Sequence, residues 1–252
     1  MNETKLKNID VKKILFFDIE TVPQKSSFSE LDETWKVLWK IKCKSLLKKD
    51  KSEEVTEIEA QDKYSEAGIY SEFGKIACIS VGVITQIDNC FGFRLKSFSN
   101  FDESILLREF SKLLNDKFSD STNSILCGHN IKEFDVPYIA RRMIINHIDL
   151  PNLLEIYGKK PWELSYLLDT MELWKFGDYK SYTSLKLLAA VFGIPSPKDD
   201  IDGSQVGAVF WKEKDLSRIV KYCQKDVLTT AQIFLKYINS DPINTNQIEY
   251  VE

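Results

Sequence analysis

The order of apolar patterns along the chain constrains its fold more than any other feature of the sequence. A short apolar run over residues 13–18 predicts a buried first strand. The other predicted elements follow in chain order: strands over 76–84 and 91–98, a helix over 103–114, a strand over 124–127, a helix over 136–145, a strand over 167–170, and helices over 184–192, 205–211 and 215–237. Strands first, then alternating strands and helices, and helices last is the pattern of a three-layer α/β fold.

The length of 252 residues suits a single large domain, which we expect over residues 1–239. A helical insertion is expected at about 26–70, because that stretch is charged, lacks proline and carries apolar residues at helical spacing. Its lysines, among them Lys42 and Lys44, form a solvated face or touch a nucleic-acid strand. Residues 240–252 are polar and predict a frayed tail.

Composition limits where the protein works and what it binds. Its five cysteines are irregularly spaced, which is typical of the reducing cytoplasm. No apolar run approaches the roughly 20 residues of a membrane helix, so no membrane partner is expected. The net charge of −4 argues against a protein that coats DNA regardless of sequence. It does not exclude nucleic acid as a substrate of an acidic site that first binds cations.

Carboxylates gather in three separate motifs. Asp18 and Glu20 are two residues apart at the end of the first predicted strand, so their side chains share one face. Two acids in an apolar strand are costly unless a cation or hydrogen-bond donors neutralise them. The alternative is that the strand ends at Phe17 and both acids are solvated.

The second and third motifs each have an ordinary structural explanation as well. Asp135 stands at the start of a predicted helix, where the helix dipole favours an acid, and Asn130 could be a loop residue or cap. Tyr222 and Asp226 are four residues apart on the last long helix and share a face, where a core tyrosine beside a surface acid is common.

The three motifs together, in this order, resemble the DEDD superfamily of 3′–5′ exonucleases in its tyrosine-bearing branch. The chain is most similar to stand-alone bacterial exonucleases related to the proofreading domain of family-B DNA polymerases. The similarity extends to the stretches 72–76, 184–193 and 199–206. It implies an RNase H-like fold with a mixed five-stranded sheet. It also implies release of nucleoside monophosphates from the 3′ end of DNA, with single-stranded DNA as the expected partner and repair as the expected role.

The resemblance also implies roles for individual residues. Two Mg²⁺ or Mn²⁺ ions would be held by the four acids, and oxygen ligands favour such hard cations. Ions about 3.5–4 Å apart can contact the attacking and the leaving oxygen together. The implied metal ligands are Asp18, Glu20, Asp135 and Asp226. The implied catalytic residues are these four acids and Tyr222, which would orient water. The implied substrate contacts are Thr21, Val22, Asn130, Phe134 and Lys198. His129 is expected to be a structural hydrogen-bonding residue, and Asp169 a cap between strand and helix.

Two other functions fit the same residues. A 3′ exoribonuclease of the RNase D kind shares the four acids and the tyrosine, and the sequence does not separate the two substrates. A catalytically inactive nucleic-acid-binding protein is the alternative outside enzymes, although such proteins usually lose at least one metal ligand.

Overall fold

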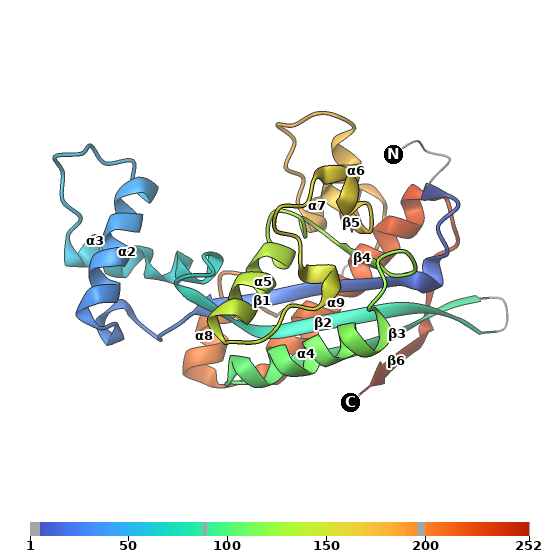
Figure 1. Cartoon of the computed structure of the whole chain (residues 1–252), viewed down its shortest axis with the longest axis horizontal. Helices are drawn as coiled ribbons and strands as arrows, with labels where there is room; N and C mark the ends of the chain where they lie inside the picture. Colours follow the sequence, from blue (N-terminus) through green and yellow to red (C-terminus); the bar gives the residue numbers. More distant parts are fainter. Residues whose placement is uncertain (1–5, 88–89, 196–199, 252) are drawn as a thin grey trace.

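The computed structural model describes residues 6–87, 90–195 and 200–251, and a mixed six-stranded sheet forms its centre (Figure 1). The strands lie in the order β5-β4-β1-β2-β3-β6. Their bounds are β1 Ile14–Pro23, β2 Gly74–Ile87, β3 Cys90–Ser99, β4 Ile125–Gly128, β5 Leu167–Asp169 and β6 Ile243–Val251. β2 pairs antiparallel with β1 and β3, whereas β4 is parallel to β1 and β5, and β6 is parallel to β3.

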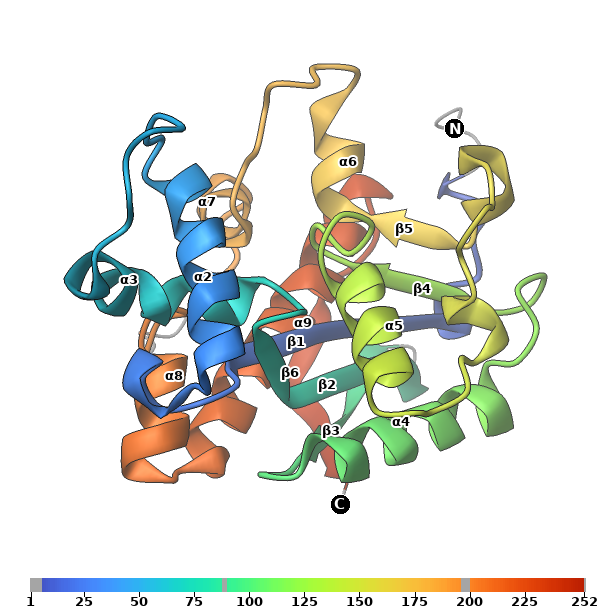
Figure 2. The same cartoon turned by 60° about the vertical axis from the view of Figure 1, so that its left-hand side comes forward.

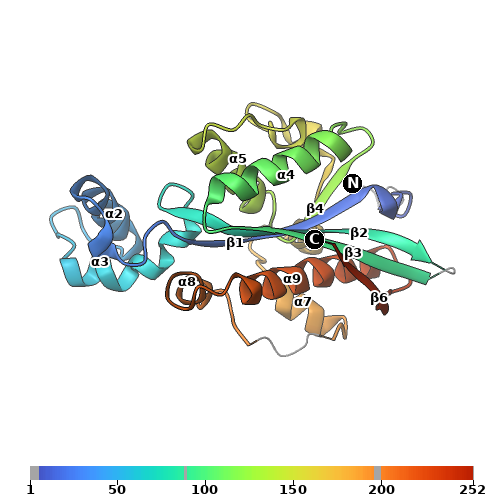
Figure 3. The same cartoon turned by 90° about the horizontal axis from the view of Figure 1, so that it is seen from below.

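Helices cover both faces of this sheet (Figure 3). α4 and α5 lie on one face, and α9 lies with α7 on the other. The helix bounds are α2 Glu33–Leu46, α3 Glu57–Lys63, α4 Glu103–Lys117, α5 Asp135–Ile145, α6 Thr170–Lys175, α7 Leu185–Val191, α8 Val206–Ala208 and α9 Leu216–Tyr237. This arrangement confirms the predicted three-layer α/β fold of the RNase H-like kind.

The alternation of side chains along β1 decides which face of the sheet carries the acids. Leu15, Phe17 and Ile19 are buried in the apolar cluster beneath α4 and α5. Phe16 points to the opposite face, where it packs on Phe234 of α9. Since side chains alternate along a strand, the acids that follow Phe16 also point toward α9.

Residues 24–73 connect β1 to β2 and form a helical lobe beyond the end of the sheet (Figures 1 and 3). The lobe contains α2, α3 and the short 3-10 turns η2 (Phe28–Glu30) and η3 (Tyr64–Ile69). Its own apolar cluster surrounds the buried Trp39, whose indole Nε1 donates to the Ala60 carbonyl at 2.9 Å.

The structure corrects three predicted elements. The sheet has six strands instead of five, because the segment predicted as a polar tail forms β6 along the free edge of β3. An edge strand is held largely by backbone hydrogen bonds, so polar side chains do not prevent it. α6 was not predicted, and the helix expected over 205–211 is the short α8 followed by a π-helical turn, η6 (Val209–Glu213).

Within the described part of the chain, none of the helices combines the length and apolar character of a membrane span.

Candidate active site

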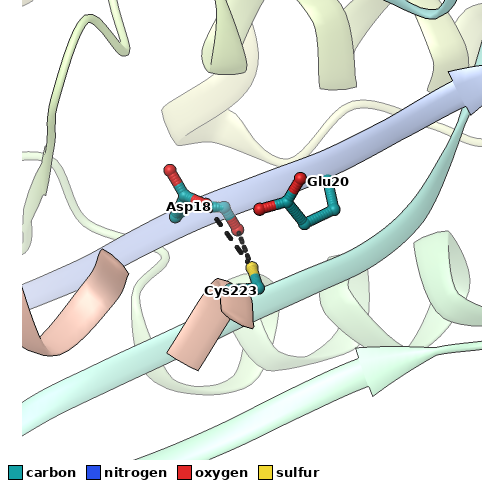
Figure 4. Close-up of side chains that lie close together, drawn as sticks. All are labelled: Asp18, Glu20 and Cys223. Carbon is teal, nitrogen blue, oxygen red and sulfur yellow. Dashed lines mark hydrogen bonds between the residues drawn. The ribbon is translucent and has the colours of Figure 1, made fainter. Parts of the chain in front are cut away.

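Two carboxylates of β1 converge with a thiol of α9 on one face of the sheet (Figure 4). Asp18 is half-buried and Glu20 is buried, with 8% of its surface exposed. One oxygen of each acid and the Cys223 sulfur lie within 4.8 Å of one another. The predicted shared face of Asp18 and Glu20 is therefore present, and β1 runs through both acids to Pro23 instead of ending at Phe17.

Asp135 approaches the same acids from α5. β4 pairs with β1 only through Phe16, so the edge of β1 beyond that residue lies outside the ladder. Asp135 is the first residue of α5, and its Oδ1 accepts a hydrogen bond from the Ile19 amide at 3.2 Å. β4 and β1 lie close together at Gly128, where a Cβ atom would be 2.8 Å from the Phe17 carbonyl oxygen. The glycine therefore lets the chain that leads to Asp135 pass close to β1.

Asp226 completes the group from α9. Asp226 and Asp135 both raise the pKa of Asp18, and both raise the pKa of Glu20. Because these carboxylates repel one another, the four acids form one electrostatic group. Asp226 and Tyr222 also line a pocket of about 210 Å³, together with Lys186 and Ala189 of α7 and with Ser184, which caps the start of α7.

The electrostatics of the group favour a bound cation. Burial, followed by the neighbouring acids, raises the pKa of Asp18 and of Glu20 well above the usual range. Burial raises the pKa of Asp135 to about 8. The charged groups that raise the pKa of Asp18 are Asp135, Asp226 and Glu20, all of them acids. Carboxylate oxygens that repel one another in this way suit a hard divalent cation such as Mg²⁺ or Mn²⁺.

Cys223 is a site residue that sequence reasoning missed. Its sulfur lies 3.3 Å from the Asp18 carbonyl oxygen and 3.5 Å from Asp18 Oδ2. Burial raises the pKa of the thiol well above its usual range, so the neutral S–H donates to these oxygens. The signal in the sequence is its place between Tyr222 and Asp226, next to a tyrosine of the third motif.

The predicted substrate contacts have different surroundings. Thr21 is half-buried, and its side chain is hydrogen-bonded to Tyr138. Val22 is fully buried in an apolar cluster, which leaves its side chain no surface for a nucleotide. Phe134 is half-buried and packs on Tyr138, with 5.4 Å between ring centroids. Lys198 lies outside the described residues.

Asn130 is held in a left-handed backbone conformation, with φ of 65°. Its amide donates to Asp169 Oδ1 at 2.9 Å, and the Lys132 amide donates to Asp169 Oδ2 at 3.1 Å. Asp169 also caps α6, as predicted, by accepting from the Met171 and Glu172 amides. One buried carboxylate thus fixes the loop that leads to Asp135, a second role that the sequence did not reveal.

His129 has the structural role predicted for it. Its Nε2 donates to the Thr183 carbonyl, and its Nδ1 contacts Thr170 Oγ1, both at 2.9 Å. Burial lowers its pKa, so the ring is neutral near pH 7. The histidine ties the Asn130 loop to the segment before α7.

Comparison with known proteins identifies a family for this chain. No curated protein matches the chain. A family model does match it over residues 69–249, and its description reads "predicted 3′-5′ exonuclease related to the exonuclease domain of PolB". The matched range contains Asp135, Tyr222 and Asp226, whereas Asp18 and Glu20 precede it. The match covers more than half of the chain, and the chain therefore belongs to this family of 3′–5′ exonucleases related to the PolB exonuclease domain.

Proposed function

We propose that the protein removes nucleoside monophosphates from the 3′ end of single-stranded DNA, using two divalent cations held by Asp18, Glu20, Asp135 and Asp226. The observation that carries the proposal is the convergence of these acids from β1, α5 and α9 on one another. Glu20 and Asp135 are buried, and Asp18 and Asp226 are half-buried. Four acids gathered in this way are destabilising without a cation, so their assembly supports a metal-binding role.

The residues of the chain have separable tasks in this reaction. When bound, the divalent cations supply Lewis-acid activation of water and stabilise the leaving 3′ oxygen. Asp18 and Glu20 present their oxygens from a rigid central strand. Asp135 is fixed by its hydrogen bond to Ile19, so it keeps its position relative to both. Cys223 donates to Asp18 and thereby limits the directions in which that carboxylate can turn.

In the proposed reaction, Tyr222 acts on water and does not take a proton. It lies on the same face of α9 as Asp226, at the pocket shared with α7. A phenol with an ordinary pKa near 10 is a poor base at neutral pH. We assign its hydroxyl to orienting the attacking water in line with the scissile phosphate.

We expect the protein to act in the cytoplasm. All five cysteines are free, and four of them are buried, which fits a compartment that keeps thiols reduced.

A cleavage assay on a 5′-labelled single-stranded DNA oligonucleotide tests the proposal. We expect a ladder that shortens from the 3′ end with Mg²⁺ or Mn²⁺, and no ladder with chelator. Asp18→Asn and Asp226→Ala should abolish it, while Asp116→Asn, an exposed acid on α4, should cleave like the wild type. A matched RNA oligonucleotide separates the exoribonuclease alternative, and failure on both substrates in both metals would contradict the proposed activity.

A further inference from the structure

The segment between α6 and α7 exposes three aromatic rings within seven residues. Phe176, Tyr179 and Tyr182 are 83%, 86% and 66% exposed. Single exposed apolar residues are ordinary, but a group of large rings on one connecting segment marks an interaction surface. We call residues 176–182 the aromatic loop.

The backbone at the start of this loop is strained, and the strained residue is not buried. Phe176 is left-handed, with φ of 43°, a conformation uncommon for a bulky residue. Glycine or asparagine would end α6 there with less strain. A phenylalanine that is both strained and exposed is consistent with selection for the ring itself.

Both ends of the aromatic loop are tied to the loop that leads to Asp135. At one end, Lys175 Nζ lies 3.9 Å from Glu133 Oε1. At the other, His129 donates to the Thr183 carbonyl at 2.9 Å. The chain then passes from α6 into α7 (Figure 2). Lys186 and Ala189 of α7 line the pocket that Tyr222 and Asp226 also line. The three rings therefore lie on the segment that leads directly into the candidate active site.

The charges around the rings complement a phosphate backbone. Residues 175–186 contain three lysines and one acid, in a chain whose net charge is −4. Lys175 Nζ lies 4.2 Å from the Tyr182 ring centroid, and Lys180 is exposed next to Tyr179. Lys186 is exposed at the pocket itself. Aromatic rings interleaved with lysines are the arrangement that binds single strands, because every base offers a face for stacking.

We propose that the aromatic loop binds the nucleotides that precede the 3′ end of a single-stranded nucleic acid. Bases stack on Tyr179 and Tyr182, with Phe176 extending the surface, and phosphates contact Lys180 and Lys186. Paired bases have their faces occupied within the duplex, so this surface selects single strands. The inference rests on the proposed function, since it assigns the strand path leading to that site.

Binding and cleavage by the full chain test the inference separately. The probe for binding is a fluorescent single strand of about 15 nucleotides, followed by anisotropy in chelator, beside a duplex of the same length. We expect Tyr179→Ala with Tyr182→Ala to weaken binding by at least roughly 30-fold, and the wild type to prefer the single strand by at least about tenfold. The logarithm of the affinity falls as the logarithm of the salt concentration rises, and Lys180→Ala should make this slope less steep by about 0.7.

Two control variants separate the rings from general effects of substitution. Tyr250→Ala removes a ring that is 64% exposed on β6, at the opposite edge of the sheet, and should bind like the wild type. Tyr179→Phe keeps the ring and should bind within about twofold of the wild type. In the cleavage assay, the wild type should have a higher kcat/KM for the long strand than for a dinucleotide. The double variant with Tyr179→Ala and Tyr182→Ala should have a smaller ratio of these two values.

The outcomes distinguish this inference from the proposed function. If the wild type cleaves and the alanine pair keeps both affinity and length preference, the loop is not the strand path. Equal wild-type affinity for single strand and duplex also overturns the inference. If the wild type cleaves nothing, the proposed function fails, and the anisotropy measurement alone decides the role of the loop.

Discussion

Asp135 Oδ1 accepts a hydrogen bond from the backbone amide of Ile19 at 3.2 Å, and Ile19 stands between Asp18 and Glu20. This contact joins the start of α5 to the middle of β1 across 116 residues of chain. It places a third carboxylate beside the first two at a point where β4 no longer pairs with β1. The resulting arrangement is electrostatically unfavourable without a cation, and this has measurable consequences.

The metal-free protein should lose stability as the pH rises. The pKa of Asp135 is raised to about 8 in the folded state, above its usual value of 3.8, and the pKa of Asp18 is also raised. The folded state therefore binds more protons than the unfolded state between about pH 4 and pH 8, and the free energy of unfolding falls across that window. Thermal unfolding in chelator should give a lower Tm at pH 8 than at pH 5. A Tm that rises across this range would contradict the raised pKa values of these buried acids.

Asp18→Asn should stabilise the metal-free protein at pH 8, because it removes one of the repelling charges. The gain should be roughly 2–4 °C in Tm for each kcal/mol of repulsion relieved, and smaller at pH 5, where Asp135, whose pKa is raised to about 8, is protonated in the folded state. Asp116→Asn removes an exposed charge of the same kind and should leave the Tm unchanged. Destabilisation by Asp18→Asn at pH 8 would mean that the carboxylate has a favourable partner in the apoprotein.

Added Mn²⁺ should raise the Tm of the wild type, since an ion that binds only the folded state stabilises it by mass action. At a free concentration of about 100 times Kd the gain is roughly 2.7 kcal/mol. Asp18→Asn should lose most of this shift, and Asp116→Asn should retain it. An equal shift in all three proteins would place the cation elsewhere on the surface.

Asp169→Asn should loosen the loop before Asp135. The carboxylate accepts four backbone amides, those of Asn130, Lys132, Met171 and Glu172. An asparagine side chain turns one acceptor into a donor that faces these amides, which should cost about 1–3 kcal/mol of stability. We expect kcat to fall more than KM rises, because the loop that leads to Asp135 loses the contacts that the Asn130 and Lys132 amides make with this carboxylate. The matched control is Glu163→Gln, which changes an exposed acid in the 3-10 turn Pro161–Leu164.

The sequence predicted the layers of the fold and the shared face of Asp18 and Glu20, because both follow from local periodicity. It did not predict β6, since that strand is held by pairing with β3 and not by an apolar pattern of its own. The second role of Asp169 and the donation from Cys223 were also missed. Each depends on backbone groups that are distant in sequence, and side-chain spacing carries no information about those.

Tyr222→Phe should slow turnover and leave the Mn²⁺-induced rise in Tm nearly unchanged. The ring would still pack on the apolar cluster that includes Val22 and Ile219, and only the hydroxyl that orients water would be lost. Paired measurements of kcat and of Tm with and without Mn²⁺ test this. Unfolding of the variant would instead assign the tyrosine to the core, and an unaffected kcat would remove its hydroxyl from the reaction.

Ile243→Ala should destabilise the protein, although the sequence around residue 243 reads as a polar tail. Ile243 is 3% exposed and belongs to the apolar cluster that includes Phe93 and Phe234. Its backbone is also fixed by Gln232, which accepts from the Ile243 amide at 3.2 Å and donates to its carbonyl at 3.3 Å. Truncating a buried isoleucine to alanine costs about 2–5 kcal/mol, which a shift in the urea midpoint would reveal.

Tyr250→Ala, at an exposed position of the same strand, should leave that midpoint unchanged. If Ile243→Ala has no effect either, β6 does not contribute to the folded state, and the predicted frayed tail describes the molecule better. Because β6 lies at the edge of the sheet away from β1, metal-dependent cleavage at low temperature should persist in the folded Ile243→Ala protein. The same variant thus separates the stability of the sheet from the chemistry of the four acids.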